Sequence, residues 1–572
     1  MMPARTVRLA SPRRLAVRLA VASLAVVVLV ASGLASGRKF YDDDPIAREP
    51  ETQDASGAAP TDVSLFYELS YSLFVTAGRQ PSGLRAQNIN TIDEVPDSGW
   101  FTNRVGSRAV STDEIVRGPV VGPPPAPGTW TIIREKASGA APGFTARDSA
   151  GQTWFVSFDA PTNPEGATSC IVVASKLFWG LGYNQVESFV TSLRREQLAI
   201  DPKATVRRAS GKRTPMSEND LGAVLERVPR QADGSYRVAV GRLLSGKVLG
   251  PFRYEGTRPD DPNDLVPHEH RRELRALRVF GAWTNLTDMK AGNTLDTLVT
   301  EHGRSTVRHY LQDVGSTFGI GANRPHDWDE GWEYFYQNDA TWRRFRSFGF
   351  DLSPWQTVKY EDVPAVGPFE GDQFEPETWR PHSPMTSYLE MRADDAFWAA
   401  RRVMAFTDEL IRAAVRTGGY SDPAAERHLA DVLIKRRDKI GRAYLTRINP
   451  IVDPVLGADG VLTFGNAAAQ FGFAPAPERY ESVWHAFDNA TSESRRIESA
   501  SSATARIQAP RGLPTERGSY VRVQLSATSA QHPAWAEPID VYFRRVEGGW
   551  KLVGLERLPE KTLPTPPSGA SR

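Results

Sequence analysis

The chain has 572 residues, of which 40% are AVILMFWYC and 46 more are Gly, a globular composition that excludes a disordered or collagen-like protein. Lys and Arg total 69 against 68 for Asp and Glu, so no global positive field would attract nucleic acid, and we expect no nucleic-acid partner. The single cysteine, Cys170, excludes an intrachain disulfide and lacks the spacing of a zinc site.

The first 37 residues have the pattern of an export signal. Several arginines precede residues 19–37, which carry no charge and begin with a continuous apolar run. The run suits a cleaved signal peptide, but the uncharged stretch also reaches the length of a short membrane span, about 17 to 25 residues. A signal peptide and a membrane anchor both stay open for residues 1–37. We expect an exported protein that is periplasmic, secreted or membrane-anchored, with membrane contact possible through residues 19–37.

The next two segments have different compositions. Residues 38–60 contain an acidic run together with Ala, Gly and Pro, which predicts a disordered linker. Residues 61–128 predict an N-terminal strap, because apolar residues at helical spacing over 63–75 indicate a helix that docks on a later domain. A proline-rich stretch over 118–128 marks the end of the strap.

Two lobes follow the strap. Residues 129–265 predict a strand-rich N-lobe, with two strands around a turn over 130–158 and a helix over 169–180. Residues 266–450 predict a helical C-lobe, because apolar residues recur at helical spacing over 270–284, 394–417 and 423–448.

The last part of the chain is again strand-like. Residues 451–560 carry alternating segments and have the size of an ordinary β-sandwich, and residues 561–572 predict a disordered tail. The predicted fold class is therefore α+β, with a two-lobed core followed by a C-terminal β-sandwich domain.

Two acidic motifs lie close together in the predicted C-lobe. Asp288 and Asn293 form a DxxxxN spacing on a loop, where the Asp can orient or deprotonate a hydroxyl and the Asn offers a neutral oxygen ligand to Mg²⁺. Asp313 follows a strand-like segment and precedes Val-Gly, a position from which a carboxylate can hold Mg²⁺ against phosphates. These three residues are candidates for a phosphoryl-transfer site.

Around these motifs the sequence resembles the atypical protein-kinase-like fold, in particular the HipA-like kinases and, more distantly, the phosphatidylinositol kinases. NLTDMKAGN is similar to the catalytic loop of that fold, which implies Asp288 as the catalytic aspartate and Asn293 as a metal ligand. YLQDVGSTFG is similar to its metal-binding loop, which implies Asp313 as the principal Mg²⁺ ligand. The resemblance covers about residues 129–450 and implies Mg²⁺ and ATP, or another phosphorylated donor, as cofactors. The segment NINTIDEVPDSGWFTNR also resembles a set of exported bacterial proteins.

The resemblance further implies a nucleotide-binding turn in the N-lobe. The turn is assigned to Gly139 and Gly143, since glycine lets the backbone approach phosphates closely, and Lys136 stands beside it. In kinases of this fold, the corresponding strand carries a lysine that pairs with a glutamate of the next helix. Here Ser157 occupies the position of that lysine, so Glu165, the candidate glutamate, would have no lysine partner. A lysine from another direction, Lys136 or Lys176 on the following helix, would have to supply the charge.

Two functions therefore stay open at this point. The first is a divergent metal-dependent phosphotransferase; the second is a catalytically inactive pseudokinase that binds an unknown protein or cell-envelope component as a scaffold. Export favours the second or an unusual donor, because ATP is scarce outside the cytoplasm. Nine aromatic residues crowd residues 328–350, where a kinase-like chain places a substrate-facing segment, although aromatic residues at mixed spacing are more often core.

Overall fold

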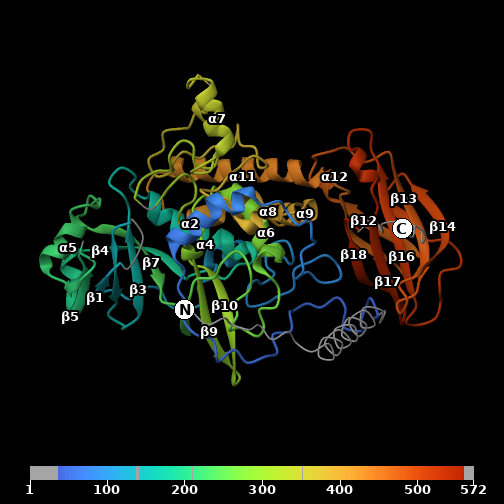
Figure 1. The fold of residues 1–572 in the computed structure, drawn as a ribbon, viewed down its shortest axis with the longest axis horizontal. Coiled ribbons are helices and arrows are strands. Elements are labelled where there is room, and N and C mark those ends of the chain that lie inside the picture. The colour runs from blue at the N-terminus through green and yellow to red at the C-terminus, as the bar shows by residue number, and fades with distance from the viewer. Residues whose placement is uncertain (1–36, 137–140, 209, 322, 351, 560–572) are drawn as a thin grey trace, which may run out of the picture.

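The computed structural model describes residues 37–136, 141–208, 210–321, 323–350 and 352–559. Within them the protein is a mixed α/β structure with one large mixed sheet and several antiparallel sheets (Figure 1). The signal peptide or anchor expected at 1–37 lies outside the described residues apart from Gly37, and the tail expected at 561–572 lies outside them entirely. Over the described ranges, no helix combines the length and the apolar character that a membrane crossing requires.

A seven-stranded sheet follows the proline-rich stretch, with the order β4-β7-β3-β2-β1-β5-β6. Only β1 and β5 pair in parallel; the other neighbours are antiparallel. Alternating large side chains, such as Trp154 and Phe158, pack with Leu221 of α5 (Glu218–Leu225) into one hydrophobic cluster. The strands are β1 (Trp130–Glu135), β2 (Gly143–Arg147), β3 (Thr153–Phe158), β4 (Ser188–Leu193), β5 (Leu198–Arg207), β6 (Arg213–Pro215) and β7 (Tyr236–Arg242).

The largest hydrophobic cluster lies among the helices in the middle of the molecule (Figure 1). The hydroxyl of Thr407 accepts a hydrogen bond from Leu410 N at 3.2 Å, and this N-cap divides the helix expected over 394–417 into α9 and α10. The helices that contribute to this region are α3 (Thr112–Arg117), α4 (Gly166–Leu181), α6 (Arg272–Thr284), α8 (Thr386–Leu389), α9 (Ala393–Met404), α10 (Asp408–Arg416) and α11 (Pro423–Leu445).

A small antiparallel sheet adjoins both predicted acidic motifs. It contains β8 (Lys247–Gly250), β9 (Thr294–Glu301) and β10 (Arg304–Leu311) in the order β10-β9-β8. The loop after α6 leads into β9, and Asp313 follows the end of β10. Because β9 and β10 form a hairpin in which Thr294 pairs with Leu311, the start of β9 and the end of β10 lie side by side.

Two antiparallel sheets form the C-terminal region. Their side chains enter one hydrophobic cluster, to which the smaller sheet contributes Leu462 and the larger sheet Trp484 and Val523. The smaller sheet has the order β11-β12-β15 and the larger β14-β13-β16-β17-β18. The elements are β11 (Ile451–Leu456), β12 (Val461–Asn466), α12 (Ala467–Gln470), β13 (Arg479–Phe487), β14 (Ser494–Ser502), β15 (Arg506–Gln508), β16 (Tyr520–Thr528), β17 (Ile539–Val546) and β18 (Gly549–Glu556).

Residues 38–60 differ from expectation, because they pack against two sheets instead of forming a disordered linker. The buried ring of Phe40 lies 5.1 Å from the ring of Tyr542 and 6.1 Å from that of Phe487. Further on, Ala55 and Ala58 are buried against the β8–β10 sheet. The acidic and small residues predicted a solvated chain, but one buried aromatic ring and two small side chains that fit against a sheet are enough to order it.

Candidate functional site

Backbone and side-chain hydrogen bonds bring the three predicted acidic-motif residues together. Asn293 Nδ2 donates to the backbone oxygen of Asp288 at 2.6 Å, and the backbone N–H of Asp313 donates to the backbone oxygen of Asn293 at 3.0 Å. The loop that carries the first two residues begins where α6 ends at Asn285, which adopts a left-handed conformation with φ 55°. We call residues 285–293 the motif loop.

Asp288 is a partly exposed carboxylate beside the Lys290 ammonium and the His382 imidazole. Both its oxygens accept hydrogen bonds from Lys290 Nζ, at 2.8 and 2.7 Å, and Oδ1 lies 3.7 Å from Nδ1 of His382. Burial alone would raise the pKa of the Asp288 carboxyl, but His382 and Lys290 outweigh burial and hold that pKa well below its ordinary value. Asp288 is therefore charged at every physiological pH.

The donor atoms of Asn293 and Asp313 suit a hard divalent cation. Asn293 uses its amide nitrogen for Asp288, which leaves its carbonyl oxygen as the atom that can face a ligand. Asp313 is exposed, and its Oδ1 accepts a hydrogen bond from Gly315 N at 3.0 Å. In the part of the chain that the structure describes, no group of three or more His, Cys, Asp or Glu side chains could hold a metal ion. A cation here would have to complete its shell with phosphate oxygens and water, as Mg²⁺ commonly does.

Lys136, directly after β1, approaches this group. Its side-chain Cδ lies 3.4 Å from the point that a Cβ of Gly143 would occupy, and Gly143 pairs in the sheet with Ser157. Burial lowers the pKa of Lys136, and the negative charge of Asp313 acts in the opposite direction. The Lys136 side chain therefore lies beside Gly143, and its amine is within electrostatic reach of Asp313. Gly139, the other glycine of the predicted turn, lies outside the described residues.

Glu165 and Lys176 take other partners. Glu165 precedes α4 in a left-handed conformation with φ 68°, and its Oε2 accepts a hydrogen bond from Ser421 N at 2.9 Å. Lys176 Nζ donates to the backbone oxygen of Arg117, at the end of α3, at 2.9 Å. Among the described residues neither forms an ion pair, so Glu165 is not the partner of Lys136 and Lys176 is committed to α3.

The predicted strap helix crosses the motif loop. It is α2 (Leu65–Phe74), and its Glu68 Oε1 accepts a hydrogen bond from Ala291 N at 2.5 Å. A Cβ on Gly292 would come within 2.8 Å of Leu65 Cδ2, so the side chain of Leu65 lies directly on the loop. The strap therefore closes one side of the motif loop, between Asp288 and Asn293.

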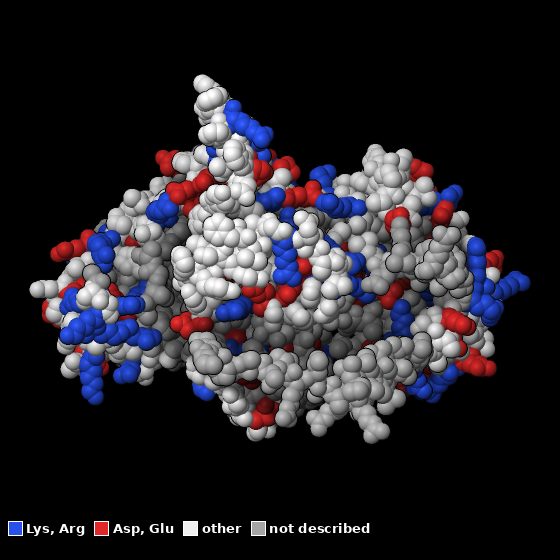
Figure 2. All heavy atoms as spheres, in the orientation of Figure 1, with Lys and Arg blue, Asp and Glu red and all other residues white. Residues whose placement is uncertain are grey.

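Most of the nine aromatic residues in the stretch 328–350 are exposed, so the core interpretation is wrong for them. Phe335 and Tyr336 lie near the motif loop, and the ring of Tyr336 is 6.5 Å from that of Phe74 of α2. α7 (Asn338–Arg346) projects from the molecule (Figure 1), and Phe348 just beyond it is 91% exposed. Figure 2 shows a surface almost without charge around α2, below this projection. The other exposed large apolar side chains of α7 and its flanks are Trp328, Trp342, Phe345, Phe350 and Leu352.

Three residues that contact Asp288 or its partners were not predicted. Lys290 carried a signal in the sequence, because it lies two positions after Asp288 on the same loop. His382 and Glu330 carried none, because each comes from a distant segment that only the fold brings to the loop. His382 Nε2 lies 2.6 Å from Glu330 Oε2.

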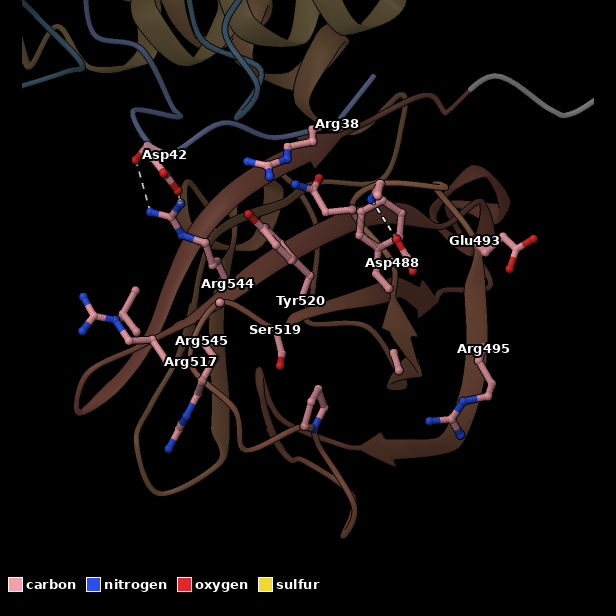
Figure 3. Close-up of a pocket in the computed structure, with 17 residues that line it drawn as sticks. Arg38, Asp42, Asp488, Glu493, Arg495, Arg517, Ser519, Tyr520, Arg544 and Arg545 are labelled. Atoms are coloured by element: carbon pink, nitrogen blue, oxygen red, sulfur yellow. Dashed lines mark hydrogen bonds and ion pairs between the residues drawn. The ribbon is translucent and has the colours of Figure 1, made fainter. Parts of the chain in front are cut away.

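A large cavity lies elsewhere, on the C-terminal β region (Figure 3). It is open, has a volume of about 1220 Å³, and is lined in part by Arg495, Arg517 and Arg545. Arg544 also lines it but is paired with Asp42 at 2.7 Å. No residue of the motif loop lines this cavity, so its size does not make it part of the Asp288 site.

Comparisons with known proteins give little to set beside this geometry. No protein-family model matches the chain, and no curated protein matches it. Among solved structures, a crystal structure of the Golgi casein kinase is similar over 71% of this chain and 97% of its own, with 11% sequence identity and a TM-score of 0.27. The same kinase with Mn and ADP bound is similar over 69% of this chain and 95% of its own, again with 11% identity and a TM-score of 0.27. At these scores the functional conclusion has to rest on the site itself.

Proposed function

We propose that the protein is a divergent, metal-dependent phosphotransferase with a two-lobed, kinase-like core. The observation that carries the proposal is the chain of contacts that joins Asp288, Asn293 and Asp313, with the amine of Lys136 in electrostatic reach of Asp313. Phosphoryl transfer needs an oriented hydroxyl, oxygen ligands for a divalent cation and positive charge near the phosphates, and these residues offer all three.

Each residue has a distinct part in this proposal. Asp288 accepts a hydrogen bond from the acceptor hydroxyl, and takes its proton as the hydroxyl oxygen bonds to phosphorus and the phosphorus–leaving-group bond breaks. Its low pKa makes orientation its main contribution, since a weak base removes the proton only late in the reaction. Asn293 and Asp313 would hold Mg²⁺ or a similar cation, which when bound neutralises phosphate charge.

Lys136 replaces the missing strand lysine in this proposal. Ser157 cannot supply positive charge, but Lys136 lies beside Gly143, the strand partner of Ser157. An ammonium in this place can contact phosphate oxygens from the turn instead of from the strand. Because Glu165 is bound to Ser421, the cation would work without that glutamate.

We further propose that this activity is exported. The uncharged stretch of residues 19–37 supports a location outside the cytoplasm, so the donor is ATP supplied there or another phosphorylated compound. The C-terminal sheets share one hydrophobic cluster, which supports a β-sandwich, and we propose that this domain binds a protein or envelope component.

Ligand-dependent thermal stability tests the proposal directly. Purified protein is titrated with Mg²⁺ or Mn²⁺ together with nucleoside triphosphates, and transfer of labelled phosphate is followed in parallel. We expect the melting temperature to rise with metal and nucleotide together, and Asp313→Ala to abolish that rise. Asp431→Ala is the matched control, because Asp431 is an exposed carboxylate paired with Arg412 outside the motif loop. Absence of any shift at millimolar ligand contradicts the proposal.

The second candidate is a catalytically inactive scaffold, and Ser157 is the observation that favours it. If Ser157→Lys creates metal–nucleotide binding that the parent lacks, the parent has lost a kinase site and the scaffold function is preferred. If Lys136→Ala abolishes binding that the parent possesses, the phosphotransferase is preferred.

A further inference from the structure

A second layer of charged residues lies behind Asp288. His382 Nδ1 lies 3.7 Å from Asp288 Oδ1, and His382 Nε2 lies 2.6 Å from Glu330 Oε2. The imidazole therefore lies between two carboxylates, one on the motif loop and one behind it. The first distance is an ion-pair contact longer than a hydrogen bond, whereas the second is a short hydrogen bond.

Further bonds fasten this pair to the residue before Asp288. The backbone N–H of His382 donates to the backbone oxygen of Thr287 at 3.0 Å, and the hydroxyl of Thr287 donates to Glu330 Oε2 at 3.0 Å. Glu330 Oε1 also accepts a hydrogen bond from Asp327 N at 3.0 Å. His382, Glu330 and Thr287 thus form a closed ring of contacts, which fixes the orientation of the imidazole relative to the motif loop.

The surroundings of His382 favour its charged form. Burial lowers the pKa of His382, but Asp288 and Glu330 outweigh burial and raise that pKa above its ordinary value. The ring of Phe335 stacks on the imidazole at 4.2 Å between centroids, so one face is covered by an apolar group. The other ionisable groups of the cluster are Lys290, bound to Asp288, and the buried His326, 3.7 Å from Glu330 and neutral because burial lowers its pKa to about 4.

Lys290 and His382 differ in how firmly they are held. The side chain of Lys290 is 39% exposed and, among the residues that the structure describes, forms hydrogen bonds only with Asp288, whereas His382 is 17% exposed and hydrogen-bonded at its backbone N–H and at Nε2. An exposed ammonium exchanges partners readily, and a phosphate group is a strong competitor for it. If Lys290 contacts a phosphate instead, His382 is still held beside Asp288 by its own hydrogen bonds.

We infer that His382, held by Glu330, is a positioning residue that keeps the Asp288 carboxylate oriented and charge-compensated while Lys290 contacts phosphate. The inference deepens the proposed function and rests on it. His382 does not touch substrate; it acts through Asp288. Phe335 completes the arrangement, because its ring covers one face of the imidazole.

The first experiment does not depend on activity. The full chain is prepared with ¹³C-labelled histidine, and the titration of His382 is followed by NMR in the parent and in three variants. We expect His382 to titrate above 6.5 in the parent, and its pKa to fall in Glu330→Gln and in Asp288→Asn. His428→Gln, which removes a histidine paired with Glu361 on another surface, should leave the His382 titration unchanged. A parent value at or below 6.5, or no change on replacing Asp288, overturns the inference.

The second experiment measures phosphate transfer. We expect His382→Gln and Glu330→Gln each to lower kcat by about tenfold to a hundredfold, the usual cost of losing an orienting partner, with little change in KM for the nucleotide. His428→Gln should retain the parent kcat. If His382→Gln behaves like His428→Gln, the inference fails although the proposed function stands. If the parent transfers no phosphate but the titrations are as expected, the proposed function fails and the pairing of His382 with Asp288 is upheld.

Discussion

Two clusters in this protein pair basic with acidic side chains, but one cluster is fully buried and the other is partly exposed to solvent. At the junction of α6 and α9, Arg272 and Arg275 pair with Asp395 at 2.9 and 3.0 Å, and all three side chains are 0% exposed. At the motif loop, Lys290 and Asp288 pair at 2.7 Å with 39% and 29% of their side chains exposed. The first cluster is sealed and the second is open.

The difference shows which charges are free to change partners. In the sealed cluster the arginines also donate to backbone oxygens, Arg272 to Asp93 at 2.7 Å and Arg275 to Leu84 at 2.9 Å, so every change leaves a buried group unpaired. In the open cluster water can replace a partner that leaves. We therefore expect the sealed cluster to determine stability and the open cluster to determine ligand binding and reaction.

Asp395→Asn should have the largest effect on stability. It removes the charge that faces two fully buried arginines, so we expect a loss of about 3–5 kcal/mol in the free energy of unfolding. Urea denaturation, followed by circular dichroism, measures the loss. Asp431→Asn, which breaks the exposed pair with Arg412, should cost no more than about 1 kcal/mol. Equal effects of the two variants would contradict the distinction between sealed and open clusters.

His326 should make the protein sensitive to acid. Burial lowers the pKa of His326 from 6.5 to about 4. Between pH 6.5 and 4, the imidazole is therefore protonated in the unfolded chain but not in the folded chain. The protein should therefore lose up to about 3 kcal/mol as pH falls from 6.5 to 4. Melting temperatures from pH 7.5 to 4.5 measure this loss, which should be smaller in His326→Gln.

His382 should have the opposite sign. Its folded pKa is raised, so the stabilisation it supplies is present at pH below its unfolded value and is lost as pH rises through the folded value. In a plot of melting temperature against pH, His382→Gln should therefore reduce the decline toward alkaline pH. The decline toward acid pH should not change. For the preceding prediction, an equal loss of melting temperature at acid pH in His326→Gln and the parent would show that the buried imidazole of His326 is charged in the folded protein.

Asp288→Asn should affect activity far more than stability. The carboxylate is partly exposed, so we expect the free energy of unfolding to change by no more than about 1 kcal/mol. Phosphate transfer should fall by a factor of about 100 or more, because the acceptor hydroxyl loses the anion that orients it. A destabilisation as large as that of Asp395→Asn would instead mean that Asp288 serves to stabilise the fold.

Phe348→Ser should have the smallest effect. The ring is 91% exposed, so its removal should change the free energy of unfolding by no more than about 0.5 kcal/mol. Phe40→Ala is the contrasting variant, because its ring is buried and its removal should cost about 3–5 kcal/mol. Thermal denaturation of both variants tests whether burial, and not residue type, sets the cost.

The sequence predicted those features that depend on local pattern. The helix over 270–284, the loop with Asp288 and Asn293, and the strand before Asp313 follow from helical spacing, turn residues and alternation, and the structure contains them all. The long helix over 394–417 was wrong in its continuity, because the N-cap at Thr407 is a local bond that apolar spacing does not reveal.

Features that depend on distant contacts were not predictable. His382 and Glu330 reach Asp288 only through the path of the chain between β10 and α9, which carries little regular structure. The exposure of the aromatic residues near α7 was missed because composition indicates apolar surface but not what covers it. The packing of residues 38–60 was not predictable either, because it depends on the contacts of Phe40, Ala55 and Ala58 with distant strands.

The seating of residues 38–44 has a consequence for how the molecule is held. Lys39 pairs with Glu556 at 2.8 Å and Phe40 packs on Tyr542, so the start of the described chain is fastened to its last strands. If the chain were attached to a bilayer, a bead or a fused protein upstream of residue 37, the part of the folded protein next to the attached end would therefore be the C-terminal sheets. The distance of the motif loop from residue 37 would then be set by the dimensions of the folded protein.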